Sequence, residues 1–180
     1  PEPPAMTRRL LVILGVCAFA SAASMRVLDP VMPLIASEFS KTIQEAALLS
    51  TWFTISYAIG QPILGPMGDS FGKARLISIS LLAVAVFLVM ASLAPSFGLF
   101  GATRALTGLA AGGIIPLGIA MIGDRAPVNQ RQILLARFML ATLSGQIAGG
   151  LIAGGLSPYV GWRGVLLIVA MISLAAGVGS

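Results

Sequence analysis

Six long apolar segments separated by short turns constrain this chain more than any other feature of its sequence. A helix that crosses a bilayer needs about 20 largely apolar residues. No segment alternates apolar and polar residues with period two, as a transmembrane β-barrel would. The sequence therefore predicts an all-α integral membrane protein with six transmembrane helices, at Leu10–Ser37, Glu45–Gly65, Leu76–Ala94, Leu99–Gly123, Ile133–Ser157 and Gly164–Ser180.

Charged residues are scarce, and their distribution excludes several classes of function. They make up 9% of the chain, against about 25% in a soluble domain. The net charge of +5 comes from bases spread singly at helix ends, which does not favour a nucleic-acid partner. One cysteine and no histidine exclude an internal disulfide and a His- or Cys-based metal site. No nucleophile–base pair or phosphate loop indicates an enzyme, and no cofactor is expected.

The start of the chain admits two interpretations. Arg8 and Arg9 followed by an apolar run and small residues are typical of a secretory signal peptide. The apolar run, however, continues to Ile35, and five more candidate spans follow. We therefore interpret 10–37 as the first membrane helix and 1–9 as a cytoplasmic tail.

Lysine and arginine in the turns predict the orientation of the bundle. If the amino terminus is inside, one side carries seven bases and the other carries Lys41 and Arg163 alone. Because cytoplasmic turns are enriched in Lys and Arg, this bias predicts a cytoplasmic amino terminus in a plasma (bacterial inner) membrane. The seven inner bases are Arg8, Arg9, Lys73, Arg75, Arg125, Arg131 and Arg137.

Three charges fall inside the predicted hydrocarbon: Arg26, Asp29 and Arg104. Each costs about 2.5–3.5 kcal/mol to insert, so such residues face a cavity or a partner. Counted from the outer turns, Asp29 lies about 13 Å deep and Arg104 about 12 Å deep. One interpretation is a structural ion pair that joins the first and fourth helices. The other is a polar cavity in which Asp29 exchanges a proton beside the two arginines.

Other polar and small residues recur at helical spacing. Ser50, Thr54, Tyr57 and Gln61 form one stripe on the second helix, which either lines a cavity or satisfies neighbouring helices. Small-x-x-x-small spacing lets helices approach closely, and prolines at 30, 33 and 116 predict bends. The glycines expected to pack helices are Gly108, Gly112, Gly145, Gly149, Gly150 and Gly154.

The stretch GPMGDSFGKAR at Gly65–Arg75 predicts a tight, charged turn between the second and third helices. It resembles the cytoplasmic signature of the major facilitator superfamily. The matching positions are Gly65, Asp69, Gly72, Lys73 and Arg75, while Ser70 replaces a usual arginine.

Three further stretches resemble motifs of the same superfamily, in the order of its amino-terminal half. RVLDPVMPLIASEF is similar to the first-helix motif of efflux members. Arg104 with two glycines resembles the fourth-helix motif of proton-coupled carriers, with Thr107 where glutamine is usual. GQIAGGLIAGG, ending in GWR, resembles the antiporter motif, with Gln146 in place of its proline.

The resemblance implies a bundle of two inverted three-helix repeats and a second, carboxy-terminal half that this chain lacks. It also implies alternating access to a substrate held between the halves, with Asp69 docking on the partner half. The expected proton-coupling residues are Asp29 and Arg104. The expected substrate cavity is lined by Arg26, Asp29, Thr54, Tyr57, Gln61, Arg104 and Gln146.

Three hypotheses about function follow. The first is proton-coupled efflux of small organic molecules. The second is an organic-anion carrier, because two cavity arginines against one aspartate leave a positive site. The third is a non-transporting half-length scaffold or remnant. The expected partners are the lipid bilayer, a small organic substrate, the proton, and the missing half or a second half-transporter copy.

Overall fold

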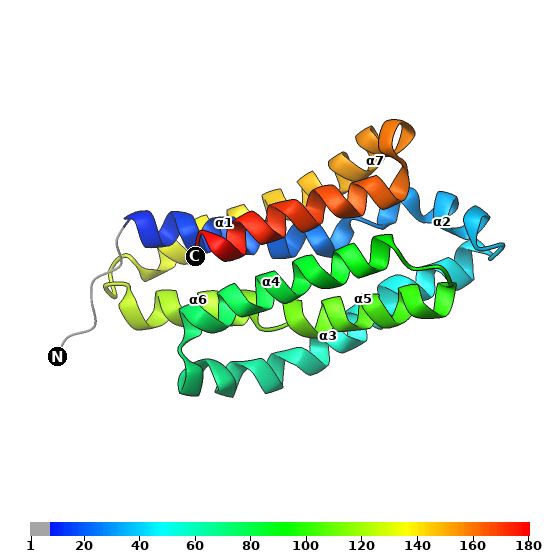
Figure 1. Cartoon of the computed structure of the whole chain (residues 1–180). Coiled ribbons are helices and arrows are strands. Elements are labelled where there is room, and N and C mark those ends of the chain that lie inside the picture. Colours follow the sequence, from blue (N-terminus) through cyan, green and yellow to red (C-terminus); the bar gives the residue numbers. More distant parts are fainter. Residues whose placement is uncertain (1–7) are drawn as a thin grey trace.

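The computed structural model describes residues 8–180, and every element within that range is a helix, as the sequence predicts (Figure 1). Residues 1–7, most of the expected tail, lie outside the described residues. The elements are α1 (Arg8–Arg26), the 3-10 helix η1 (Asp29–Val31), α2 (Met32–Glu38), α3 (Ile43–Phe71), α4 (Lys73–Ser92), α5 (Phe97–Ala111), α6 (Ile114–Arg125) and α7 (Arg131–Val178).

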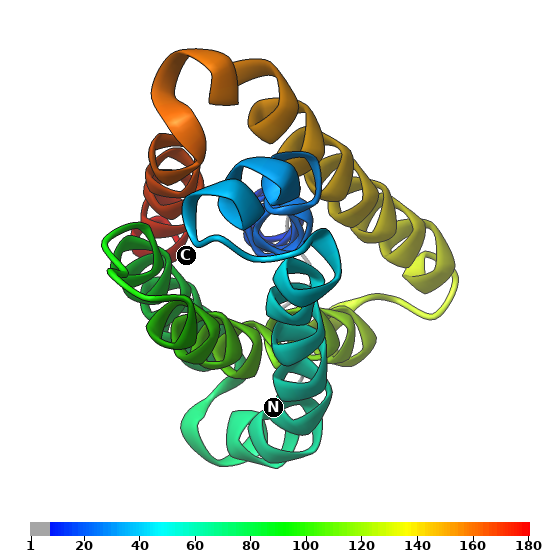
Figure 2. The same ribbon diagram turned by 90° about the vertical axis from the view of Figure 1, so that its right-hand side faces the viewer.

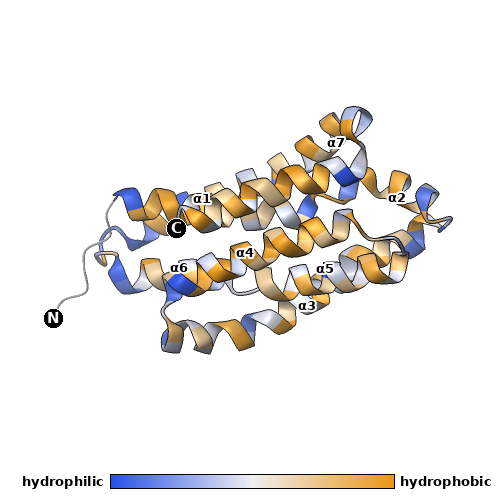
Figure 3. Cartoon of the chain, viewed as in Figure 1, coloured by the Kyte–Doolittle hydropathy of each residue, from blue (hydrophilic) through white to orange (hydrophobic). Residues whose placement is uncertain are grey.

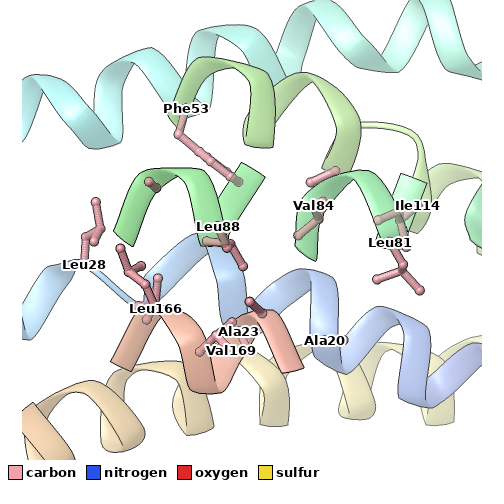
Figure 4. Packing of buried hydrophobic residues seen from close by; sticks show 14 of the residues in the cluster. Ala20, Ala23, Leu28, Phe53, Leu81, Val84, Leu88, Ile114, Leu166 and Val169 are labelled. Atoms are coloured by element: carbon pink, nitrogen blue, oxygen red, sulfur yellow. The ribbon is translucent and has the colours of Figure 1, made fainter. Parts of the chain in front are cut away.

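The helical segments run back and forth between two ends of an elongated bundle (Figures 1 and 2). α1 packs along α7, α3 packs along α5, and α4 lies against both α5 and α7. Small residues on α1 allow this close packing, and larger aliphatic side chains fill the space between α4 and α7. Figure 4 shows part of the core, including Ala20, Ala23, Leu28, Phe53, Leu81, Val84, Leu88, Ile114, Leu166 and Val169.

Most residues along the length of the bundle are hydrophobic, and hydrophilic residues gather towards its two ends (Figure 3). Four helical segments are long and apolar enough to cross a membrane: Arg8–Glu38, Lys73–Ser92, Phe97–Arg125 and Arg131–Val178. They include five of the six expected spans. The expected span 45–65, on α3, carries the polar stripe and is not among the four.

The prediction of a turn over Gly65–Arg75 is wrong for most of these residues. α3 continues through Pro62 and Pro66 to Phe71, and the reversal occurs at Gly72 alone, whose φ is 89°. Packing explains the difference: Gly68 is buried on this helix, where a Cβ atom would lie 2.2 Å from the side chain of Leu117 on α6. Tertiary contact on one face thus keeps helical a stretch that its prolines and glycines disfavour.

The prolines of the first segment lie at helix starts. α1 ends at Arg26, Pro30 occupies the first turn of η1, and Pro33 occupies the first turn of α2. Proline is tolerated there because the first-turn N–H has no partner inside the helix. The expected helix 10–37 is therefore interrupted at 27–28, beside Arg26 and Asp29.

The expected fifth and sixth helices follow each other without a loop and together make up α7, whose 48 residues are two helices joined by a kink. Straight, it would be about 72 Å long, more than twice the thickness of the hydrocarbon core. It instead folds back at Gly161, whose φ of 69° suits a residue without a side chain. The fold-back is visible as the orange bend of α7 in Figure 1.

Candidate functional site

Arg26 and Asp29 form an ion pair on the surface of the bundle, where the first segment is interrupted. Arg26 Nη1 donates to Asp29 Oδ2 at 3.2 Å, and the two side chains are 59% and 44% exposed. They share an open pocket of about 410 Å³ with Gln146 of α7. The pocket thus joins three of the expected cavity residues, although Gln146 lies 117 positions after Asp29 in the sequence.

Arg104 does not line this pocket. It lies on α5, is fully buried, and donates from Nη1 and Nη2 to the backbone carbonyl of Ser24, at 3.3 Å each. Its guanidinium carbon is 4.5 Å from the centre of the Phe53 ring. The expected ion pair between Arg104 and Asp29 is therefore wrong, since Asp29 pairs with Arg26 on its own segment.

The position of Ser24 explains how a buried arginine is stabilised without a salt bridge to a carboxylate of the described residues. Ser24 lies in the last turn of α1, where carbonyl groups lack a partner within the helix. The carboxyl end of a helix carries a partial negative charge, which favours a cation there. Arg104 thus caps α1, and the face of the Phe53 ring adds a cation–π contact.

The polar stripe lies along one side of α3, as expected. None of its residues lines the pocket that Arg26, Asp29 and Gln146 share. Thr54 and Gln61 are exposed, and Tyr57 is half-buried and stacks on Phe53. The Thr54 hydroxyl donates to the Ser50 carbonyl at 2.8 Å. Thr54 and Gln61 are therefore accessible at the surface of the bundle, as Arg26 and Asp29 are.

One end of the bundle carries a three-residue charge cluster. Lys73 Nζ lies 2.8 Å from Asp69 Oδ1 on α3 and 2.8 Å from Asp124 Oδ2 on α6. The cluster borders a hollow of about 450 Å³ that also includes Gly72 and Arg75. Asp124 was missed by the sequence reasoning, although it begins the basic turn that precedes α7.

The opposite end carries a second cluster, whose side chains belong to two stretches that resemble superfamily motifs, RVLDPVMPLIASEF and GWR. Arg163 pairs with Glu38 at 2.7 Å and also donates to the backbone carbonyls of Ser92 and Ala94. The indole of Trp162 donates to the same carboxylate. The cluster ties together the ends of α2 and α4 and the returning part of α7.

Four of the expected packing glycines lie where helices nearly touch. A Cβ atom at Gly108 or Gly112 would come within 2.2 and 2.5 Å of carbonyl oxygens of α3. At Gly145 and Gly149 the corresponding distances, to carbonyls of α1, are 2.3 and 2.4 Å. Any side chain at these positions would push the helices apart.

Gly150 and Gly154 differ from these four. A Cβ atom at Gly154 would make only an ordinary contact with Pro30, at 3.6 Å. At Gly150 no atom lies within 4 Å of that position, and the residue lines the pocket beside Arg26. The expectation that Gly150 packs helices within this chain is therefore not met.

Comparison with known proteins gives a consistent result. The family described as the Major Facilitator Superfamily matches residues 14–179. The uncharacterized MFS-type transporter YwfA of Bacillus subtilis is 30% identical over 86% of this chain and 37% of its own length. The multidrug resistance protein MdtG of Escherichia coli is 28% identical over 95% of this chain and 43% of its own. The chain thus spans about 40% of the length of the relatives it matches.

The fold agrees with this match. A bacterial homolog of the human lysosomal transporter Spinster, in an inward-facing and occupied conformation, superimposes with a TM-score of 0.81 at 17% identity. The aligned part covers 94% of this chain and 42% of that one. The chain belongs to the Major Facilitator Superfamily, a family of membrane transporters, and corresponds to part of one such protein.

Proposed function

We propose that this chain is the amino-terminal half of a secondary active transporter, which exports small organic molecules by alternating access coupled to protons. The observation that supports the proposal best is the exposed Arg26–Asp29 pair. Charges of this kind cost about 2.5–3.5 kcal/mol each when they face lipid at the bilayer centre. The face that carries them therefore meets water or another protein surface, as a carrier's central cavity would provide.

Six crossings of the membrane follow from this proposal. α3 returns the chain between the two ends of the bundle, and α7 crosses twice because it folds back at Gly161. The exposed polar side chains of α3, which reduce its mean hydropathy, then face the cavity rather than lipid. The two three-helix groups, α1 to α4 and α5 to α7, correspond to the inverted repeats of this superfamily.

The orientation is proposed from charge and can be tested by labelling. Six of the seven bases expected inside lie at the end of the bundle where α1 and α7 begin, or on the turns there, and this bias favours a cytoplasmic amino terminus. In a Cys17→Ser background, Ser70→Cys and Asn129→Cys should react with an impermeant maleimide only from the cytoplasmic side. Thr42→Cys should react only from outside. Labelling of position 70 in intact cells would refute the orientation.

The Asp69–Lys73–Asp124 cluster is proposed as the cytoplasmic gate. Asp69 is 69% exposed despite its ion pair, so its carboxylate can also dock on a helix amino terminus or a base of the other half. In the natural gene product that contains this chain, Asp69→Asn should abolish transport while membrane insertion stays near normal. Membrane insertion should not depend on the charge of Asp69 because this residue lies at the end of the bundle. Full activity would show that the segment is only a connector.

Efflux is favoured by the names of two relatives. MdtG is a multidrug resistance protein, and the mfs2 protein of Aspergillus flavus, 26% identical over 84% of this chain and 36% of its own length, is a probable efflux pump. The competing hypothesis is a half-length scaffold without transport. The reading frame downstream of Ser180 distinguishes them: six further membrane helices support a carrier half, and a stop codon supports a scaffold or a half-carrier that pairs with itself.

A further inference from the structure

The pocket between α1 and α7 is electrically balanced, which bears on the kind of molecule it would hold. Its charged lining residues are Arg26 and Asp29, which neutralise each other. The organic-anion hypothesis requires Arg104 in the same cavity. That residue is fully buried and bonded to the Ser24 carbonyl, so the positive excess is absent from the pocket.

The pair nevertheless keeps hydrogen-bonding capacity of both kinds. A guanidinium has five N–H donors, and Arg26 uses Nη1 on Asp29. A carboxylate accepts at two oxygens, and Asp29 accepts from Arg26 at Oδ2. Gln146 adds an amide that both donates and accepts. A ligand that carries an anion and a cation close together would therefore find a partner for each.

The rest of the pocket is apolar and leaves room beside Gly150. Ile147 and Leu151 are 64% and 70% exposed and form its apolar walls. Gly150 lies between them, with no atom within 4 Å of where its Cβ would be. Its neighbour Gly149 already supplies the close contact with α1. Packing within this chain thus does not require glycine at position 150, and a side chain there would enter the pocket.

We propose that this pocket selects a zwitterionic substrate with a small apolar body, which Arg26 and Asp29 recognise as a pair, and that Gly150 sets the size of that body. The proposal rests on the function proposed above and adds the substrate class to it. The volume of about 410 Å³ lies within the range of roughly 300–1,000 Å³ typical of small-molecule sites.

Three probes with the same phenyl group test the charge preference: L-phenylalanine, 3-phenylpropionate and 2-phenylethylamine. Their affinities are measured by titration calorimetry on the purified natural gene product. L-Phenylalanine should bind at least about tenfold more tightly than either singly charged probe, because each of those engages only one member of the Arg26–Asp29 pair. Tighter binding of 3-phenylpropionate, or no binding of any probe, would overturn the proposal.

Charge variants sharpen the test. Asp29→Asn should shift the preference to 3-phenylpropionate, and Arg26→Gln should shift it to 2-phenylethylamine, because each leaves a pocket of one sign. Both side chains are exposed, so melting temperatures without ligand should stay unchanged. If neither variant changes the order of the three affinities, the pair does not read the charge of the substrate.

Gly150→Leu tests the size limit, and Gly155→Leu is its matched control. Both glycines lie on α7 with no atom within 4 Å of the Cβ position, but Gly155 is outside the pocket. Only Gly150→Leu should weaken L-phenylalanine binding, by about tenfold or more; equal effects would refute the role of Gly150. If the variants still transport substrate with unaltered selectivity, only this inference is contradicted. If the protein binds the probes but transports none of them, the proposed function is contradicted.

Discussion

Arg104→Gln should markedly lower the melting temperature of the protein, whereas Arg26→Gln should leave it nearly unchanged. Arg104 is fully buried and is the capping group of Ser24 at the end of α1. Removing it leaves a buried carbonyl unsatisfied, which costs about 1–3 kcal/mol, and deletes a cation–π contact worth about 2 kcal/mol when desolvated. The expected loss is about 3 kcal/mol, or roughly 5–12 °C for a bundle of this size.

The two arginines form a matched pair for this experiment. Both lie within the predicted hydrocarbon segments, but the Arg26 side chain is 59% exposed and pairs with Asp29, which is 44% exposed. Exposed ion pairs contribute about 0–1 kcal/mol. Arg104→Lys should fall between the wild type and Arg104→Gln, because it keeps the charge and loses the two-pronged donor. Equal melting temperatures for Arg104→Gln and Arg26→Gln would contradict the capping role.

Much of the fold follows from the sequence because the length of an apolar run decides whether it forms a spanning helix. The failures have one cause in common, which is contact between segments far apart in the chain. The stretch Gly65–Phe71 has the composition of a turn, yet packing of Gly68 against α6 holds it in a helix. Local propensity could not reveal that contact.

The candidate site was predictable where its members are close in sequence. Arg26 and Asp29 are three residues apart, so a shared helix face indicates their proximity. The partner of Arg104 is a backbone carbonyl, and no side-chain pattern marks a carbonyl as available. The Glu38–Arg163 pair joins residues 125 positions apart. Its sequence signals are that both residues lie in stretches that resemble superfamily motifs and that both charges belong to turns expected on the same side.

Asp29→Asn should abolish transport driven by a proton gradient without destabilising the protein. If Asp29 carries the coupling proton, the amide cannot exchange one, while alternation between the two sides need not use it. Because Asp29 does not pair with Arg104 and is 44% exposed, the variant leaves no buried charge without a partner. Its melting temperature should therefore match that of the wild type, unlike that of Arg104→Gln.

The most direct test of the proposed transporter is made on one preparation of the Asp29→Asn variant of the natural gene product, reconstituted in liposomes. Uptake of radiolabelled L-phenylalanine is measured with an imposed pH gradient and, separately, as exchange against internal unlabelled L-phenylalanine without a gradient. Both assays use L-phenylalanine at a concentration high enough to offset its weaker binding to the variant. We predict that the gradient no longer drives uptake, that exchange survives, and that the wild type performs both. A stable variant with unchanged gradient-driven uptake would contradict the role of this carboxylate in a proton-coupled carrier.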